Sequence, residues 1–186
     1  KGQLYKSVDS TQDVITVYEY SFDSTGKLLS AFNTVTGVAD KTRRTEKHLW
    51  KYNAAGTPAT MLNIQNNTDT TVVNFKTDEN GNIIEEESIW RNISKGITFY
   101  YYDTSNRLTD IVRYNDKLKK HIPDYIFEYG QDGNRVEQMI NVQQNAGDYL
   151  IWKYLYNEKG LRSEERCYNK QKKLMGRIEY KYTYRG

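Results

Sequence analysis

The sequence predicts an all-β protein, an antiparallel meander of about seven β-hairpin repeats of about 26 residues each, which forms a twisted or curling sheet. Three observations support this prediction. Gly or Asn returns at a nearly constant interval, and aromatic side chains alternate with polar ones just before each return. The composition includes 17 tyrosines in 186 residues, and Tyr favours half-buried strands with its hydroxyl in contact with water. We expect one β-hairpin repeat domain over residues 1–186.

One turn residue per repeat, here called the marker residue, sets the period. The markers are Gly2, Gly26, Gly56, Gly81, Asn106, Gly133, Gly160 and Gly186. Asp or Asn stands three residues before most of them, at Asp23, Asn53, Asp78, Asp103 and Asn157. At the first position of a type I turn such a side chain caps its own backbone, and the fourth residue accepts positive φ. Each marker therefore predicts the tight turn of one hairpin.

The residues before each marker predict an outgoing strand, with aromatic side chains mostly six and four positions ahead of the marker. The pairs are Tyr20/Phe22, Trp50/Tyr52, Tyr100/Tyr102, Phe127/Tyr129, Tyr154/Tyr156 and Tyr180/Tyr182. A period of two places each pair on one face of its strand. Tyr101 and Leu155 make the opposite face apolar as well, so we expect these hairpins to be covered on both faces. We expect about twelve to fourteen strands and essentially no helix.

Longer polar connections are predicted between hairpins, and three of them are basic. The five connections run from Thr36 to Thr45, Gln65 to Thr71, Asn115 to Asp124, Gln143 to Asp148 and Asn169 to Lys173. The candidate binding cations among them are Arg43, Arg44, Lys117, Lys119, Lys120, Lys170, Lys172 and Lys173. The general explanation is that basic loops keep a sheet soluble and block edge pairing. The functional explanation is a positive rim along one edge that binds an anionic partner.

Acidic polysaccharide or protein is the partner that these features favour. Tyr and Trp side chains such as Trp90 and Trp152 could stack on sugar rings from the sheet surface. Nucleic acid is not expected, because the net charge is only +3 and no nucleic-acid-binding motif occurs.

Residues that perform chemistry are sparse, so we predict no catalytic residue, metal site or cofactor and no enzyme activity. His48 falls in a strand column and is expected to pack, whereas His121 belongs to a basic loop. Adjacent residues in the clusters 85–87 and 164–165 point to opposite faces of a strand, and solvated carboxylates are expected there. Cys167 excludes an internal disulfide, since it is the only cysteine, and it is expected to be a small strand residue.

Two segments resemble the YD repeat of the Rhs family: Phe99-Tyr-Tyr-Tyr-Asp-Thr-Ser-Asn106-Arg-Leu-Thr and Tyr20-Ser-Phe-Asp-Ser-Thr-Gly26-Lys-Leu. The resemblance implies a bacterial exported or surface protein whose hairpins add sideways into one curling sheet. Members of the family serve as a shell around a toxin or as a proposed carbohydrate binder. About seven repeats are too few to enclose a cargo, so we expect a stand-alone module or a fragment of a longer array.

The leading hypothesis is a non-enzymatic interaction or structural module of a secreted or cell-surface protein, which binds glycan or protein on its sheet surface or basic loop edge. The alternatives are a carboxylate-based carbohydrate-active enzyme of unrecognised class and a ligand-free scaffold segment of a longer array. No apolar run is long enough for a transmembrane helix. The start at Lys1 favours a removed export signal and an extracellular, periplasmic or cell-surface location. The terminal segments resemble half repeats, so we expect closure of the sheet or self-association through them.

Overall fold

The computed structural model describes residues 6–10, 13–131, 133, 135–143 and 147–182. These residues form fourteen β-strands and no helix, and hydrogen-bonded strands follow one another in chain order from β1 to β14. The pairs whose register is defined are antiparallel, from β1–β2 to β13–β14. The predicted all-β meander of about seven hairpins is therefore confirmed.

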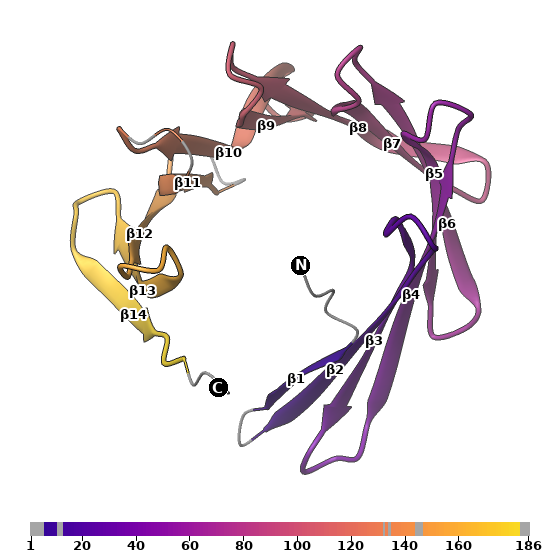
Figure 1. Ribbon diagram of the computed structural model, residues 1–186, viewed down its shortest axis with the longest axis horizontal. Coiled ribbons are helices and arrows are strands. Elements are labelled where there is room, and N and C mark those ends of the chain that lie inside the picture. The colour runs from indigo at the N-terminus through magenta and orange to yellow at the C-terminus, as the bar shows by residue number, and fades with distance from the viewer. Residues whose placement is uncertain (1–5, 11–12, 132, 134, 144–146, 183–186) are drawn as a thin grey trace. The chain divides into compact units, whose positions relative to one another are not determined.

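The strands divide into two compact units, residues 1–97 and 98–186, and the boundary falls within β8 (Ile93–Tyr102). Unit 1 contains β1 (Lys6–Ser10), β2 (Val14–Phe22), β3 (Leu28–Gly37), β4 (Arg43–Tyr52), β5 (Pro58–Gln65), β6 (Asp69–Thr77), β7 (Ile83–Trp90) and the start of β8. Unit 2 contains the end of β8, β9 (Leu108–Asn115), β10 (Lys120–Tyr129), β11 (Val136–Val142), β12 (Tyr149–Tyr156), β13 (Arg162–Asn169) and β14 (Leu174–Glu179). Within each unit, consecutive strands lie side by side (Figure 1). The prediction of a single repeat domain stays a prediction.

The marker turns have the predicted geometry. Every described marker has positive φ, namely Gly26, Gly56, Gly81, Asn106, Gly133 and Gly160. In the first turn the Gly26 amide donates to the Asp23 carbonyl at 3.0 Å, and Asp23 Oδ1 accepts from the amides of Thr25 (2.8 Å) and Lys27 (2.9 Å). A bulge follows where the β2–β3 register shifts between Ser21 and Phe22, as a type I turn with one extra residue requires. The markers Gly2 and Gly186 lie outside the described residues.

A tyrosine four positions before a marker fastens its hairpin to the preceding one, a contact here called the tyrosine clamp. The Tyr52 hydroxyl donates to the Leu28 carbonyl at 2.8 Å, and Tyr129 donates in the same way to Leu108 at 2.9 Å. The same bond joins Tyr156 to Val136 at 2.7 Å and Tyr182 to Arg162 at 2.6 Å. These hydroxyls were expected to stay in contact with water. They instead satisfy carbonyls at the bulges, where the strand ladder is interrupted.

A cation that follows the turn completes several clamps. Lys27 Nζ lies 5.3 Å from the centre of the Tyr52 ring, and Arg107 Cζ lies 4.6 Å from that of Tyr129. Arg107 also donates to the carbonyl of the next marker, Gly133, at 2.7 Å. Cations over aromatic rings and turn carbonyls thus couple neighbouring hairpins at the marker edge of each unit.

The connections at the opposite edge are shorter than predicted. Strands extend into most of them, so that the predicted connection from Gln65 to Thr71 reduces to residues 66–68 before β6. Asn66 and Asn67 have φ of 49° and 61°, the two left-handed residues of a type I′ hairpin turn. An equivalent turn, not predicted from the sequence, lies at Arg91 and Asn92, with φ of 49° and 64°. Within the predicted connection from Gln143 to Asp148, residues 144–146 lie outside the described part of the chain.

Each unit is a single sheet whose side chains are mostly half-buried. Among the described residues, the buried apolar side chains are Val73, Val112 and Cys167, which are 3%, 8% and 6% exposed. The expectation that the hairpins at Tyr101 and Leu155 are covered on both faces is wrong, because these side chains are 51% and 38% exposed. No second layer of described residues packs on them. Stability therefore depends on backbone ladders, cross-strand contacts and clamps.

The terminal strands pair with their sequence neighbours. β1 pairs with β2, and β14 pairs with β13. The predicted terminal segments extend into residues 1–5 and 183–186, which lie outside the described residues. Closure or self-association through these strands stays a prediction.

Candidate functional site

The predicted basic residues fall in both units. Arg43 and Arg44 are the first two residues of β4 and are exposed, so their assignment to a loop was wrong. The cause is that β4 continues the β3 ladder, with Arg43 opposite Thr36 and Arg44 opposite Val35. Polar residues at the end of a strand form the same backbone ladder as apolar ones, so polarity alone does not distinguish a strand end from a loop.

The other predicted cations lie at one edge of the unit 2 sheet. Lys117 and Lys119 belong to the β9–β10 turn and Lys120 begins β10, whereas Lys170, Lys172 and Lys173 form the β13–β14 turn. Because alternate connections of a meander meet at the same edge, the two groups share that edge, about 19 Å apart across four strand spacings. Their local contacts are weak: Lys119 lies 4.0 Å from Asp116, and Lys170 Nζ donates to the Gly147 carbonyl at 3.1 Å.

A row of cations not singled out by the sequence analysis crosses the strands beside the β13–β14 turn. Lys153 on β12 is directly opposite Arg166 on β13, and Arg166 is directly opposite Arg177 on β14. We call Lys153, Arg166 and Arg177 the cationic row. Like charges in directly opposed positions destabilise a sheet. The arrangement therefore carries a cost unless anions offset it.

Two carboxylates offset part of the positive charge. Glu164 receives a double hydrogen bond from Arg166, at 2.7 and 3.0 Å, and lies 3.8 Å from Arg177 Nε. Glu179 pairs with Arg177 Nη2 at 2.8 Å. Arg166 holds the pKa of Glu164 below its usual value, and Glu164 raises the pKa of Arg166 in turn. Lys153 is exposed and makes no ion pair with the residues that the structure describes.

This part of unit 2 retains an excess of positive charge. The cationic row carries three positive charges against the two negative charges of Glu164 and Glu179. The adjacent turn adds Lys170, Lys172 and Lys173, which begin about four residues or 13 Å along the strands from the row. Exposed cations at strand spacing are suited to bind a ligand with several anionic groups.

The two predicted stacking tryptophans lie in different units. Trp90 is in unit 1, where Arg91 Cζ and Lys95 Nζ approach its ring centre to 4.2 and 4.7 Å, and its indole NH donates to Asp69. Trp152 is on β12 next to Lys153, so the two side chains point to opposite faces. Trp152 is half-buried opposite Met139 and Cys167. Neither ring is an open platform for a sugar.

The histidines also differ from expectation. His48 packs in its strand as expected, and its Nε2 is hydrogen-bonded to Glu46 at 3.0 Å. His121 is a strand residue of β10 and not part of a loop, and its ring meets Phe99 and Tyr114 edge-on at 5.3 and 5.4 Å. It belongs to the strand because Lys120 and His121 continue the ladder with β9, opposite Asn115 and Tyr114.

The carboxylate clusters and the cysteine are held by structural contacts. Glu165 was expected to be solvated but is only 8% exposed, and it accepts hydrogen bonds from Arg162 at 2.7 Å and from Tyr180 at 2.6 Å. Glu85 pairs with Lys76 at 2.6 Å. Cys167 lies in β13, and burial raises the pKa of its thiol. No group of three His, Cys, Asp or Glu side chains within the described ranges is arranged to hold a metal ion.

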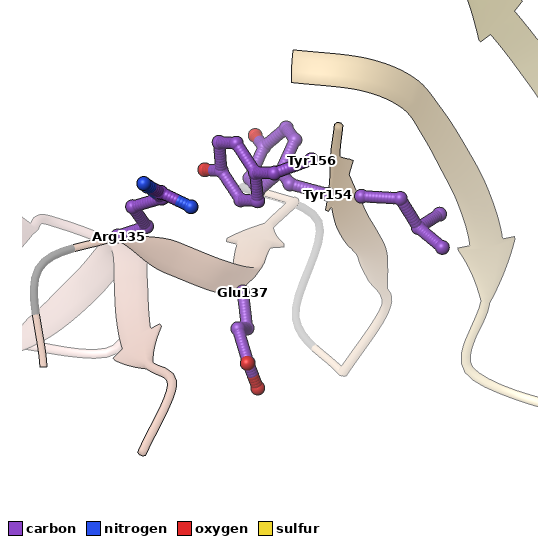
Figure 2. Close-up of a pocket in the computed structure, with 5 residues that line it drawn as sticks. Arg135, Glu137, Tyr154 and Tyr156 are labelled. Carbon is purple, nitrogen blue, oxygen red and sulfur yellow. The ribbon is translucent and has the colours of Figure 1, made fainter. Parts of the chain in front are cut away.

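A shallow hollow in unit 2 is lined by Arg135, Glu137, Tyr154, Leu155 and Tyr156. Figure 2 shows the Arg135 guanidinium directed toward the tyrosine rings and the Glu137 carboxylate directed away from them. Arg135 Cζ lies 5.4 Å from the centre of the Tyr156 ring, and Tyr156 is itself clamped to Val136. The polar groups of this hollow therefore do not converge on one point, and its tyrosines hold hairpins together.

Comparisons with known proteins give no family assignment. No family model matches the chain, and no curated protein matches it. Among solved structures, the chain is similar to a porin-like protein from Bacteroides uniformis, with 11% identical residues over 88% of this chain and 86% of that chain and a TM-score of 0.49. The resemblance to the YD repeat stays a prediction. Within the described residues, no helix is long and apolar enough to cross a membrane.

Proposed function

We propose that the chain is a non-enzymatic interaction module of a secreted or cell-surface protein that binds acidic polysaccharide on the cationic row. The observation that supports this most directly is the opposition of Lys153, Arg166 and Arg177 on three neighbouring strands. Their mutual repulsion opposes folding, and an anionic ligand would relieve it.

The spacing of the row favours a polymer over a single small anion. Neighbouring strands are about 4.8 Å apart, so the row presents one cation per strand at this interval. A pyranose unit advances an extended polysaccharide by a comparable distance, so a uronate polymer laid across the strands meets several cations. The lysines of the β13–β14 turn, at 170, 172 and 173, are displaced from the row along the strands and would contact a part of the polymer that bends toward the turn. Several weak charge contacts on one chain add to a useful affinity, and salt should weaken it.

The test compares polygalacturonate with its fully methyl-esterified form, which keeps the sugar backbone and lacks the charge. We expect the acid form to bind in low salt, and we expect little binding of the ester or in high salt. Replacement of Lys153 and Arg177 by Gln should weaken binding about tenfold, which corresponds to about 1.4 kcal/mol. The matched control is Lys47→Gln with Lys51→Gln, two exposed lysines of β4 in unit 1.

Thermal unfolding of each variant checks that the fold is intact, because Arg177 also pairs with Glu179. Equal binding of the acid and the ester would contradict the proposal. So would an equal loss in the control variant, which would indicate a response to net charge alone.

A further inference from the structure

A polar cluster on one face of unit 1 is independent of the cationic row. It consists of Asn33 on β3, Glu46 and His48 on β4, and Asn63 on β5. Asn33 is opposite Glu46, and His48 is opposite Asn63, so the register places all four on the same face. Polar side chains here interrupt a face that is otherwise rich in aromatic residues.

The Glu46 carboxylate organises the cluster. It accepts hydrogen bonds from Asn63 Nδ2 at 2.8 Å, from His48 Nε2 at 3.0 Å and from Asn33 Nδ2 at 3.4 Å. Burial by itself raises the pKa of Glu46, but the bonds from His48 and Asn63 outweigh it and lower the pKa. The side chains of His48 and Glu46 remain 30% and 32% exposed, so a ligand can reach the edge of the cluster.

Two polar atoms on the same face have no partner among the residues that the structure describes. Trp50 Nε1, a donor, and Asn63 Oδ1, an acceptor, are enclosed and make no hydrogen bond with the described residues. An enclosed polar atom without a hydrogen bond destabilises the folded protein, and native proteins leave few of them unpaired. Trp50 follows His48 by two residues on β4, so Trp50 and Asn63 are diagonal neighbours within side-chain reach. A single hydroxyl group, which both accepts and donates, would satisfy both atoms.

An apolar surface adjoins the two unpaired atoms. The Trp50 and Phe75 rings stack with 5.2 Å between centres and 6° between planes, and both side chains are half-buried. An aromatic surface beside amide, carboxylate and imidazole groups suits a ligand that has both an apolar C–H face and several hydroxyls. Saccharides have this combination, whereas an inorganic anion or an acidic peptide does not.

We infer that this cluster of unit 1 binds a neutral saccharide. One hydroxyl lies between Trp50 Nε1 and Asn63 Oδ1, neighbouring hydroxyls meet the exposed edges of Glu46 and His48, and the sugar ring lies against the Trp50–Phe75 pair. Because the two unpaired atoms are enclosed, the indole or the amide turns aside as the hydroxyl enters. The contacts involve no ligand charge, so binding here should be insensitive to salt, in contrast to the cationic row.

The experiment follows the indole N–H signals of the protein by ¹H–¹⁵N NMR during titration with neutral oligosaccharides. The panel is cellohexaose, xylohexaose, mannohexaose and maltohexaose, and Trp50→Phe identifies the Trp50 signal. We expect at least one sugar to shift this signal downfield with saturation, equally in low and high salt, because the N–H gains an acceptor. Asn63→Ala should weaken that sugar about tenfold, whereas Asn74→Ala, on the opposite face of β6, should not.

Three results would overturn the inference. The first would be that no sugar shifts the Trp50 signal. The second would be that Asn74→Ala weakens binding as much as Asn63→Ala does. The third would be that a bound water contacts the Trp50 N–H both in the free protein and in the presence of sugar, so that no hydroxyl replaces it. Trp50→Phe preserves an aromatic ring against Phe75 and should also weaken binding, so the test does not depend on the folding of one variant. Lys153→Gln with Arg177→Gln should leave neutral-sugar binding unchanged, which separates failure here from failure of the proposed function.

Discussion

The tyrosine clamp should contribute measurable stability through its hydroxyl alone. Tyr129→Phe removes the hydroxyl that donates to the Leu108 carbonyl at 2.9 Å and keeps the ring beneath Arg107. A neutral hydrogen bond contributes about 0.5–1.5 kcal/mol net, and a carbonyl left dry adds to the loss. Because the Tyr129 side chain is half-buried, water reaches part of the site, and we expect a total loss of about 1–2 kcal/mol.

The matched control is Tyr101→Phe, which removes a hydroxyl from a side chain that is 51% exposed on the opposite face of its strand. Its effect should stay within about 0.5 kcal/mol. Urea unfolding followed by circular dichroism measures the free energy of unfolding of both variants. In thermal unfolding, Tyr129→Phe should lower the melting temperature by about 2–4 °C for each kcal/mol of stability lost. Equal effects of the two variants would refute the reasoning, because the clamp hydroxyl would then contribute no more than an exposed one.

Three further predictions concern the turns and the buried thiol. Hydrogen bonds from Asn82 hold the pKa of Asp78 below 3.8, so its stabilising effect is present above that value and is lost as the pH falls through the lowered pKa. Asp78→Asn keeps the oxygen that accepts from the Asn80 and Asn82 amides, as Asn53 does in its own turn, but loses the oxygen that accepts from the Asn82 side chain. It should reduce the loss of stability between about pH 5 and pH 2 in urea titrations, and an unchanged acid dependence would contradict this. Gly81→Val should destabilise by about 1–3 kcal/mol in urea unfolding, because φ is +84° and a Cβ would lie 3.2 Å from Thr57 Cγ2, whereas Gly81→Asn should cost clearly less; equal costs would show that φ is not the reason. Burial raises the pKa of the Cys167 thiol, which is 6% exposed, so a thiol-specific disulfide reagent should react slowly with the folded protein and rapidly in urea; rapid reaction of the folded protein would show that β13 opens.

The marker turns were predictable because their chemistry is local. Asp23 and Gly26 are three residues apart, and a type I turn requires their side-chain cap and positive φ whatever the rest of the chain does. The opposite edge was less predictable, because β4 and β10 begin with charged residues that pair normally. At the missed turn, Asn92 carried the only strong signal, since Arg91 rarely accepts a φ of 49°.

The cationic row required cross-strand register, which the sequence analysis did not derive. The marker turn at Gly160 sets the β12–β13 register, and this brings Lys153 opposite Arg166. The β13–β14 turn uses Lys172 at a φ of 62°, a position where neither Gly nor Asn marks the turn. The position of Arg177 opposite Arg166 could therefore not be predicted from the sequence. The clamp bonds were missed for a similar reason, because they join residues such as Tyr129 and Leu108 in successive hairpins.

The two faces of the unit 2 sheet differ in the side chains they carry, and this difference favours binding on one of them. Most aromatic side chains on the face of Tyr154 and Tyr156 already hold hairpins together. A clamp tyrosine that left its hairpin to contact a ligand would reduce the stability of the sheet. The opposite face of unit 2 carries Lys153, Arg166 and Arg177, where opposed like charges are unfavourable for the fold itself. Glu164 and Glu179 offset only part of this repulsion, and the row lies on the face opposite the clamp tyrosines, which is why we propose that a ligand binds there. The same reasoning applies in unit 1 to Trp50 Nε1 and Asn63 Oδ1, which have no partner among the described residues, a cost that a hydroxyl-bearing ligand would remove.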